Sequence, residues 1–194
     1  MEVVELFDKY ANRYDSWYDR HEDWFRKEIE LIRKFVGDFE LGLEVGVGTG
    51  RFALELGIKY GVDLSDRMLK LAKSRRVEVV KADARALPFR DDVFDLVLFA
   101  FTLCFLEDPT SALREAKRVL RENGKLVICG VPADSKLGRE YMKRKDSPFY
   151  SNAKLYKVEE IVKMIEEVGM KVKGIDFADI KYGKDVVCIS ATFN

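Results

Sequence analysis

The chain has 194 residues, and 34 lysines and arginines balance 34 aspartates and glutamates, so its formal net charge at pH 7 is zero. That length fits one domain with a sizeable core, and the lack of a basic excess argues against a dedicated nucleic-acid or anionic-membrane binder. The longest apolar run, residues 96–106, is too short to cross a bilayer, and the acidic start predicts no signal peptide and no membrane insertion.

Cysteine usage indicates the redox state. Cys104, Cys129 and Cys188 are odd in number, lie far apart in apolar surroundings and lack metal-ligand spacing. Such a set is typical of reduced thiols in a cytoplasmic protein and not of a disulfide framework. We therefore expect free thiols, no metal site and a cytoplasmic location.

From residue 41 onward, short apolar runs alternate with segments of helical period. The runs are rich in β-branched and aromatic residues, and the predicted strands are 41–45, 58–62, 77–81, 94–101, 125–131, 171–177 and 185–193. Continuous apolar runs of this length suit strands buried on both faces of a parallel sheet. The alternation predicts an α/β fold over residues 41–194, with right-handed crossovers and helices on both faces of an open sheet.

The predicted helices between these strands each carry one apolar stripe and cover residues 65–74, 110–121 and 157–168. Ser65 and Thr110 are the expected N-caps of the first two helices. Asn123-Gly124 is expected to end the second helix and lead into a strand.

Two regions fall outside this alternation. Residues 1–40 are predicted to be helical, with aromatic residues spaced for one face, namely Phe7, Tyr10, Tyr14, Trp17 and Tyr18. Residues 132–155 are polar, aromatic-punctuated and aperiodic. Both flank the places where a doubly wound sheet opens its ligand crevice. The first region is either a helix packed statically on the core or a lid, and the second is an expected substrate-side loop or cap.

The most informative motif is a glycine loop that follows the first predicted strand. Gly46, Gly48 and Gly50 alternate, which lets the backbone turn tightly and approach a ligand closely. A dinucleotide fingerprint would need a small residue where Arg51 stands, and Glu44 would repel a pyrophosphate. Because a carboxylate attracts an ammonium group, the motif favours a ligand with an ammonium over NAD, the alternative being an ordinary glycine-rich turn.

Two further acids close the next two predicted strands. Asp63 can accept hydrogen bonds from a ribose diol, and it can also serve as N-cap of the helix at 65–74. Asp83 can accept from an adenine amine, while the small Ala84 leaves room for the ring. Together with Glu44, these acids predict a nucleoside-binding groove along one edge of the sheet.

Taken in order, these motifs resemble the class I S-adenosylmethionine-dependent methyltransferases, and most of all the small-molecule branch that includes ubiquinone- and menaquinone-biosynthesis enzymes. The resemblance extends over nearly the whole chain and rests on residues 10–15, 44–50, 61–65, 82–84, 87–89, 94–97, 118–120 and 123–124. It implies a three-layer Rossmann-like fold whose seven-stranded, mostly parallel sheet has an antiparallel last strand, covered by an N-terminal helical lid at residues 1–40. It also implies S-adenosylmethionine as cofactor and S-adenosylhomocysteine as product.

The resemblance further implies which residues hold the cofactor: Tyr10, Tyr14, Glu44, Gly46, Gly48, Gly50, Asp63, Leu64, Met68, Asp83, Ala84, Phe99 and Ala100. Glu44 and the glycine loop would hold its methionine end, Asp63 the ribose and Asp83-Ala84 the adenine. Leu64 and Met68 would pack near the adenosine, and Phe99 and Ala100 would lie under the cofactor and contribute backbone contacts. Tyr14, or second Tyr10, would reach its carboxylate or methyl group.

Methyl transfer requires mainly alignment and exclusion of water, and a base only if the accepting atom is protonated. No catalytic residue can be assigned from the sequence. His21 is expected to be a surface or packing residue, and Cys104 stands near the position where many relatives carry a histidine and is expected to be a buried hydrophobe. The acceptor is predicted to be a small molecule.

Two alternatives keep the same fold. Base amino methylases place an Asn/Asp-Pro-Pro-aromatic element after the fourth strand, which residues 99–102 lack, so a nucleic-acid or protein methylase is disfavoured. A non-catalytic S-adenosylmethionine-binding module stays open at this point. The sequence predicts neither the acceptor's identity nor the oligomeric state.

Overall fold

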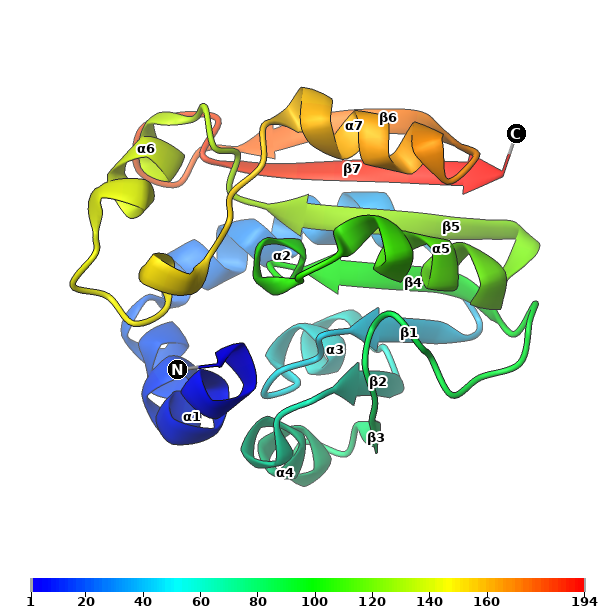
Figure 1. Ribbon diagram of the computed structural model, residues 1–194, viewed down its shortest axis with the longest axis horizontal. Helices are drawn as coiled ribbons and strands as arrows, with labels where there is room; N and C mark the ends of the chain where they lie inside the picture. The colour runs from blue at the N-terminus through cyan, green and yellow to red at the C-terminus, as the bar shows by residue number, and fades with distance from the viewer. Residues whose placement is uncertain (1, 194) are drawn as a thin grey trace.

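The apolar runs form one seven-stranded sheet with the strand order β3-β2-β1-β4-β5-β7-β6 (Figure 1). The strands of the computed structural model, which describes residues 2–193 and so leaves Met1 and Asn194 outside, are β1 (Gly42–Val45), β2 (Tyr60–Asp63), β3 (Glu78–Lys81), β4 (Phe94–Ala100), β5 (Leu120–Gly130), β6 (Met170–Ala178) and β7 (Val186–Phe193). Strands β1 to β5 pair in parallel, and β7 runs antiparallel to both β5 and β6. The predicted mostly parallel sheet with an antiparallel last strand is confirmed.

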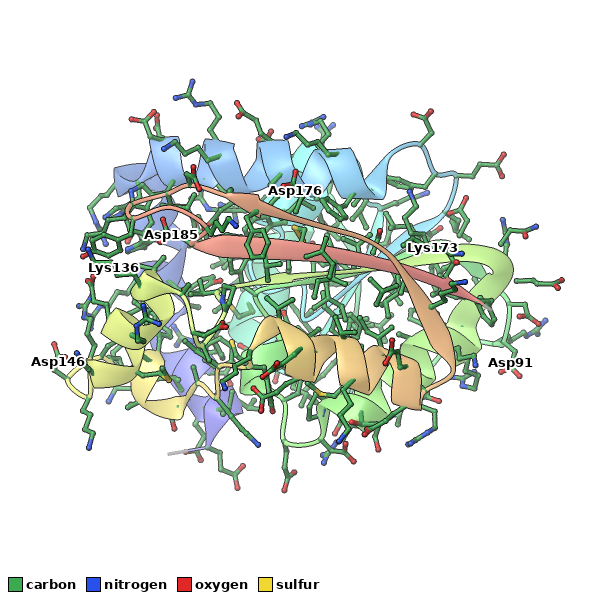
Figure 2. The ribbon with its side chains drawn as sticks, turned by 90° about the horizontal axis from the view of Figure 1, so that it is seen from above. Asp91, Lys136, Asp146, Lys173, Asp176 and Asp185 are labelled. Atoms are coloured by element: carbon green, nitrogen blue, oxygen red, sulfur yellow. A yellow bond between two sulfur atoms is a disulfide. The ribbon has the colours of Figure 1, made fainter. Side chains whose placement is uncertain are left out.

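Helices cover both faces of this sheet. They are α1 (Val3–Arg20), α2 (Glu22–Val36), α3 (Arg51–Leu56), α4 (Asp66–Ser74), α5 (Pro109–Val119), α6 (Lys136–Lys143) and α7 (Val158–Glu167), with short 3-10 helices η1 (Leu103–Phe105) and η2 (Tyr150–Asn152). Seen from above, α2 and α7 lie on opposite sides of β6 and β7 (Figure 2). Among residues 2–193, none of the helices combines the length and the apolar character that crossing a membrane requires.

Strand β4 shows why its sequence is continuously apolar. Leu96 and Leu98 enter the cluster beneath α2, α3 and α4, whereas Val97 and Phe99 enter the cluster beneath α5 and α7. Because successive side chains point to opposite faces, a strand covered on both sides needs apolar residues at every position. Strand β4 is also the central strand of the sheet, between β1 and β5, and a doubly wound sheet opens its ligand crevice at the carboxyl ends of its strands.

Two helix starts test the predicted N-caps. The Ser65 hydroxyl accepts the Met68 N–H at 3.2 Å, which confirms Ser65 as the N-cap of α4. The N-cap of α5 is Asp108 and not Thr110, because the Asp108 carboxylate accepts the Ser111 N–H and Pro109 takes the first helical position.

The predicted helix stop at Asn123-Gly124 is wrong. Helix α5 ends at Val119, and β5 begins at Leu120. Pairing with β4 jumps from Leu120 to Lys125, so Asn123-Gly124 lies in an irregularity of the strand. The turn residues therefore bend a strand and do not end a helix.

The prediction of three reduced thiols is also wrong. Cys129 and Cys188 form a disulfide, and only Cys104 is free among the described residues. The two partners are directly opposite each other on the neighbouring antiparallel strands β5 and β7. Their separation of 59 residues hides this register from an inspection of cysteine spacing.

The segment 132–155, predicted to be aperiodic, contains helix α6 and the turn η2. Helix α6 is fixed to the turn between β6 and β7, where Lys181 and Tyr182 contact the Glu140 carboxylate at 3.0 and 2.6 Å. The turn itself is organised by Asp185, whose Oδ2 accepts backbone N–H groups from Ile180 and the next three residues (Figure 2). This end of the sheet is thereby covered by an ordered segment.

Candidate functional site

A cavity of about 530 Å³ opens at the carboxyl ends of β1, β2 and β4. Its walls come from the glycine loop after β1, the turns after β2 and β3, the segment after β4 and the first part of α1. We call it the first cavity. The predicted cofactor residues that line it are Tyr14, Glu44, Gly46, Gly48, Asp63, Leu64, Met68, Asp83, Ala84 and Ala100.

Three predicted cofactor residues do not line this cavity. Phe99 is fully buried on the α5 side of the sheet, because strand alternation directs it away from the loop face. Gly50 starts α3 with φ +78°, and a Cβ there would lie 2.9 Å from the Ala72 backbone. Tyr10 turns its ring toward Phe149, with the ring centroids 6.1 Å apart.

The glycine loop presents its backbone to the first cavity. The N–H groups of Gly46 and Val47 donate to the Val62 carbonyl at 2.8 and 2.9 Å, which fixes the loop against β2. Gly46 has φ +72°, and a Cβ there would collide with the Thr102 side chain. Gly48 has φ +51°, and a Cβ there would meet no atom within 4 Å. The loop therefore needs glycine at Gly46 for packing, while Gly48 leaves open space for a ligand.

Glu44 supplies a buried carboxyl to the same cavity. It is 1% exposed, and within residues 2–193 its Oε2 has no hydrogen-bond partner. Burial raises the pKa of Glu44 well above its usual range, and the nearby Asp63 carboxylate raises that pKa further. A hydrogen bond from the Ala53 N–H lowers it in part. Because an unpaired buried polar atom is costly, Glu44 fits a ligand group that donates hydrogen bonds or carries positive charge.

Asp63 connects two of the loops that form the cavity. Its Oδ2 accepts the Gly48 N–H at 3.0 Å, and its Oδ1 accepts the Ser65 N–H at 2.9 Å. Burial raises its pKa, and these backbone hydrogen bonds counteract the rise. Since Ser65 caps α4, the N-cap alternative for Asp63 does not hold. A carboxylate can accept about four hydrogen bonds, so Asp63 retains capacity for a ligand.

Asp83 has a partner that the sequence prediction missed. The Arg85 guanidinium donates to Asp83 at 2.8 Å and to Glu107 at 2.9 Å, at the edge of the first cavity. The hydrogen bond from Arg85 lowers the pKa of Asp83. The Asp83 carboxylate is thus shared between the cavity and a cation two residues further along the chain.

Thr102 is a second missed residue. Its Oγ1 lies 3.1 Å from both the Gly46 and the Ala100 carbonyl oxygens, so it connects the glycine loop with the end of β4. The preceding Phe101 has φ +55°, which is uncommon for a residue with a side chain. A polar residue that directly follows an apolar strand was the available sequence signal.

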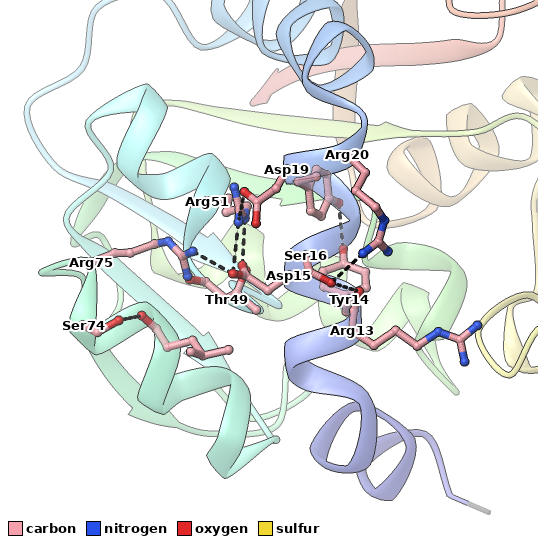
Figure 3. A network of polar contacts seen from close by, with 12 residues as sticks. Arg13, Tyr14, Asp15, Ser16, Asp19, Arg20, Thr49, Arg51, Ser74 and Arg75 are labelled. Carbon is pink, nitrogen blue, oxygen red and sulfur yellow. Dashed lines mark hydrogen bonds and ion pairs between the residues drawn. The ribbon is translucent and has the colours of Figure 1, made fainter.

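Helix α1 is fixed to the glycine loop and to α4 by an ion-pair network (Figure 3). Asp15 pairs with Arg51 at 2.8 Å and with Arg75 at 2.9 Å. Burial alone would raise the pKa of Asp15, but hydrogen bonds to Arg51, Thr49 and Arg75 lower it to about 2. Arg51, which breaks the dinucleotide fingerprint, therefore anchors the N-terminal helix.

The first part of α1 is held separately. The backbone leaves helical geometry at Tyr10, so the segment before it takes its own direction toward the first cavity, which Phe7 lines. Asp8 accepts the Ser65 hydroxyl at 2.6 Å and the Arg67 N–H at 3.1 Å. These contacts are exposed or half-buried and differ from the more buried Asp15 network.

A second cavity of about 260 Å³ adjoins the first. The two share the side chains of Tyr14, Tyr18, Phe101 and Phe105. The other walls of the second cavity come mainly from α2, η1, the end of β5, α6 and η2, so helical segments outside the sheet form much of it. One of them, Glu28 of α2, is buried and was not predicted, although an acid within the apolar stripe of a helix was a signal.

The two residues considered as bases in the sequence are not placed for that role. Burial raises the pKa of Cys104, which lines the second cavity, to about 12, so its thiol is protonated at neutral pH. His21 lines neither cavity. Its Nδ1 lies 2.8 Å from the Trp17 carbonyl oxygen, and its ring stacks on the Trp17 ring.

Comparisons with known proteins show the family to which the chain belongs. A family model described as a methyltransferase domain matches residues 43–128. A crystal structure of an S-adenosylmethionine-dependent methyltransferase from Thermotoga maritima, described as a possible histamine N-methyltransferase, superposes with a TM-score of 0.90 and 35% identity, covering 99% of this chain and 100% of that chain.

Relatives of known sequence extend the comparison. An uncharacterised protein of Methanocaldococcus jannaschii is 42% identical over 169 residues, which is 87% of this chain and 82% of that protein. A demethylmenaquinone methyltransferase of Mycolicibacterium paratuberculosis is 35% identical over 136 residues, which is 66% of this chain and 59% of that protein. The match to an uncharacterised protein of Mycobacterium tuberculosis, 38% identical, covers 52% of that longer protein.

Proposed function

The chain belongs to the S-adenosylmethionine-dependent methyltransferases, and from that premise we propose that the first cavity binds the cofactor and the second holds a small-molecule acceptor. One observation carries the proposal: the glycine loop, Glu44 and Asp63 line one cavity, and Glu44 has a buried oxygen without a protein partner. The cofactor supplies an activated methyl group, and the protein contributes alignment and exclusion of water.

The predicted contacts to the methionine end, the ribose and the adenine each have a counterpart in the proposed arrangement. The unpartnered Glu44 carboxyl suits the cofactor's ammonium group, and the open space at Gly48 lets its amino-acid end approach the backbone. Asp63 retains acceptor capacity for the ribose diol. Asp83 and Ala84 would take the adenine, with Arg85 as a competing partner of the Asp83 carboxylate.

The volume and walls of the second cavity support a small acceptor. About 260 Å³ accommodates a small organic molecule but no folded polymer. The names of two similar proteins, a demethylmenaquinone methyltransferase and a possible histamine N-methyltransferase, describe small acceptors of two different chemistries. The zero net charge of this chain also favours a small molecule over nucleic acid.

We further propose that residues 1–40 act as a lid and that residues 132–155 cap the acceptor side, while residues 41–194 hold the cofactor. The departure from helical geometry at Tyr10 supports this division, because it gives the first part of α1 its own direction and its own anchor at Asp8. In the same way, α6 and η2 of the second segment contribute Tyr141 and Tyr150 to the second cavity.

Binding calorimetry with S-adenosylmethionine tests the cofactor assignment. We expect Asp63→Ala to weaken binding by about 1–3 kcal/mol, because it removes charged hydrogen bonds to the ribose and the support of Gly48. Asp66→Ala is the matched control, since Asp66 is exposed at the start of α4 and pairs with Lys81. Equal affinities for the two variants and the wild type would contradict the ribose assignment.

A further inference from the structure

The second cavity contains a buried carboxyl that no side chain of residues 2–193 neutralises. Glu28 of α2 is 6% exposed and lines this cavity. Within the part of the chain that the structure describes, its Oε2 has no hydrogen-bond partner and it forms no ion pair. A carboxyl held in this way lacks a partner that a ligand can supply.

Neutral aromatic side chains line the same cavity as Glu28. Tyr14 and Tyr18 come from α1, Tyr141 from α6 and Tyr150 from η2. Burial raises the pKa of each of these hydroxyls, and the Glu28 charge raises each further, so all four stay protonated at neutral pH. The Tyr14 and Tyr18 hydroxyls are 2.9 Å apart, and the Tyr141 and Tyr150 rings stack at 3.9 Å.

Three arginines also line the second cavity, but they have other partners. The Arg13 guanidinium lies over the Tyr10 ring, the Arg144 guanidinium lies over the Tyr150 ring, and Arg20 donates to the Ser16 hydroxyl. All three arginines are exposed. Burial alone raises the pKa of Glu28 to about 8, with no cation opposing the rise. The inner part of the cavity is therefore acidic and aromatic, and its positive charges lie at the rim.

Aromatic faces and a single carboxyl are the groups that attract a cationic nitrogen in a desolvated site. We propose that the second cavity takes a small acceptor with a protonatable amine, and that Glu28 holds the nitrogen that receives the methyl group. This inference rests on the proposed function and names the acceptor class for the same site. Tyr14 and Tyr18 line both cavities, so the amine would lie beside the cofactor.

The carboxylate also completes the chemistry of the transfer. The bound ammonium gives one proton to Glu28, and the lone pair thus freed on nitrogen attacks the methyl carbon. The bond between that carbon and sulfur breaks, and its electron pair stays on sulfur. The products are S-adenosylhomocysteine and a protonated N-methylamine, and the proton on Glu28 passes to water when they leave.

Calorimetry on the full chain tests this inference with two probes of similar shape, 2-phenylethylamine and the neutral 2-phenylethanol. Titrations with and without S-adenosylhomocysteine at pH 7, in two buffers of different ionisation heat, give affinity and proton exchange together. We expect the amine to bind at least about tenfold more tightly than the alcohol and to release nearly one proton, because the ion pair requires Glu28 to ionise.

Glu28→Gln should lower amine affinity at least about tenfold and abolish proton release, while the affinity for 2-phenylethanol stays unchanged. Glu30→Gln is the matched control, because Glu30 lies exposed on the same helix. Retained binding of S-adenosylhomocysteine by Glu28→Gln shows that the variant is folded.

The outcomes separate this inference from the proposed function. Equal binding of amine and alcohol, no binding of the amine, or unchanged amine affinity in Glu28→Gln overturns the amine assignment. Failure of the wild type to bind S-adenosylhomocysteine overturns the proposed function, while the titrations without that nucleoside still decide the role of Glu28.

Discussion

The two cavities lie side by side but are built from different parts of the chain. The first is formed by a glycine loop and strand-end turns, with backbone N–H groups tied to Asp63 and to the Val62 carbonyl. The second is lined mainly by residues of α1, α2, η1, α6 and η2 and of the end of β5, and the buried Glu28 and several tyrosines are among them. The first cavity therefore depends on the sheet, and the second depends on how helices pack over it.

This difference places cofactor binding, which related enzymes share, and acceptor binding, which differs between them, in separate parts of the molecule. A cavity made of backbone and strand ends can hold the same cofactor in many related enzymes. A cavity made of helix side chains can change its ligand when a few residues change. We therefore expect substitutions in the first cavity to affect cofactor binding and substitutions in the second to affect acceptor binding.

The largest effect is expected in the first cavity. Gly48→Val should weaken S-adenosylmethionine binding at least about a thousandfold, or about 4 kcal/mol, because the side chain fills open space that the cofactor needs. Gly57→Val is the matched control, since Gly57 also has positive φ and no atom near its Cβ, but it ends α3 away from the cavity. Calorimetry on both variants decides the point, and similar losses would show that backbone strain and not cavity filling is responsible.

A smaller effect is expected on the free energy of unfolding, through the titration of Glu28 in the second cavity. Burial raises the pKa of Glu28 from 4.5 to about 8, so wild-type stability is complete below pH 4.5 and falls as the pH rises toward 8. At pH 7 this loss is about 3 kcal/mol, and Glu28→Gln should avoid it. Denaturant unfolding of both proteins between pH 5 and 8 measures the difference, with Glu30→Gln as control. Parallel pH curves for wild type and Glu28→Gln would show that Glu28 does not titrate as described.

The smallest effect is expected at the first part of α1, because Asp8, which holds this segment in place, does not itself line the first cavity. Asp8→Ala should weaken S-adenosylhomocysteine binding by about 1 kcal/mol, because it removes the contacts to Ser65 and Arg67 that hold this segment. In the wild type, amide hydrogen exchange of residues 3–20 should slow when the nucleoside is added. The control Asp23→Ala removes only an exposed pair with Arg26. Unchanged exchange in α1 would favour a helix packed statically on the core.

The same division explains what could be predicted from the sequence. Glu44 and Asp63 were recognisable because the carboxyl ends of parallel strands meet at one edge of a sheet, so residues that close successive strands must lie together. Glu28 was not recognised, because its place in the second cavity depends on how α2 packs over the sheet. The Arg85 pair with Asp83 likewise depends on a turn whose course the sequence pattern does not determine.

The register between strands that are distant in the sequence was the second feature that the sequence could not predict. Cys129 and Cys188 pair because β5 and β7 align those two positions, and no local pattern encodes that alignment. Phe99 was expected under the cofactor as a backbone contact. The alternation of β4 turns its side chain to the opposite face, while its neighbour Ala100 lines the first cavity.

A crystal structure with S-adenosylhomocysteine tests most directly the claim that the first cavity is the cofactor site. We expect the amino-acid end of the nucleoside at Glu44 and the glycine loop, its ribose at Asp63 and its adenine beside Ala84. The second cavity should remain free for an acceptor. Density for the nucleoside in the second cavity, or away from Glu44 and Asp63, would contradict the account.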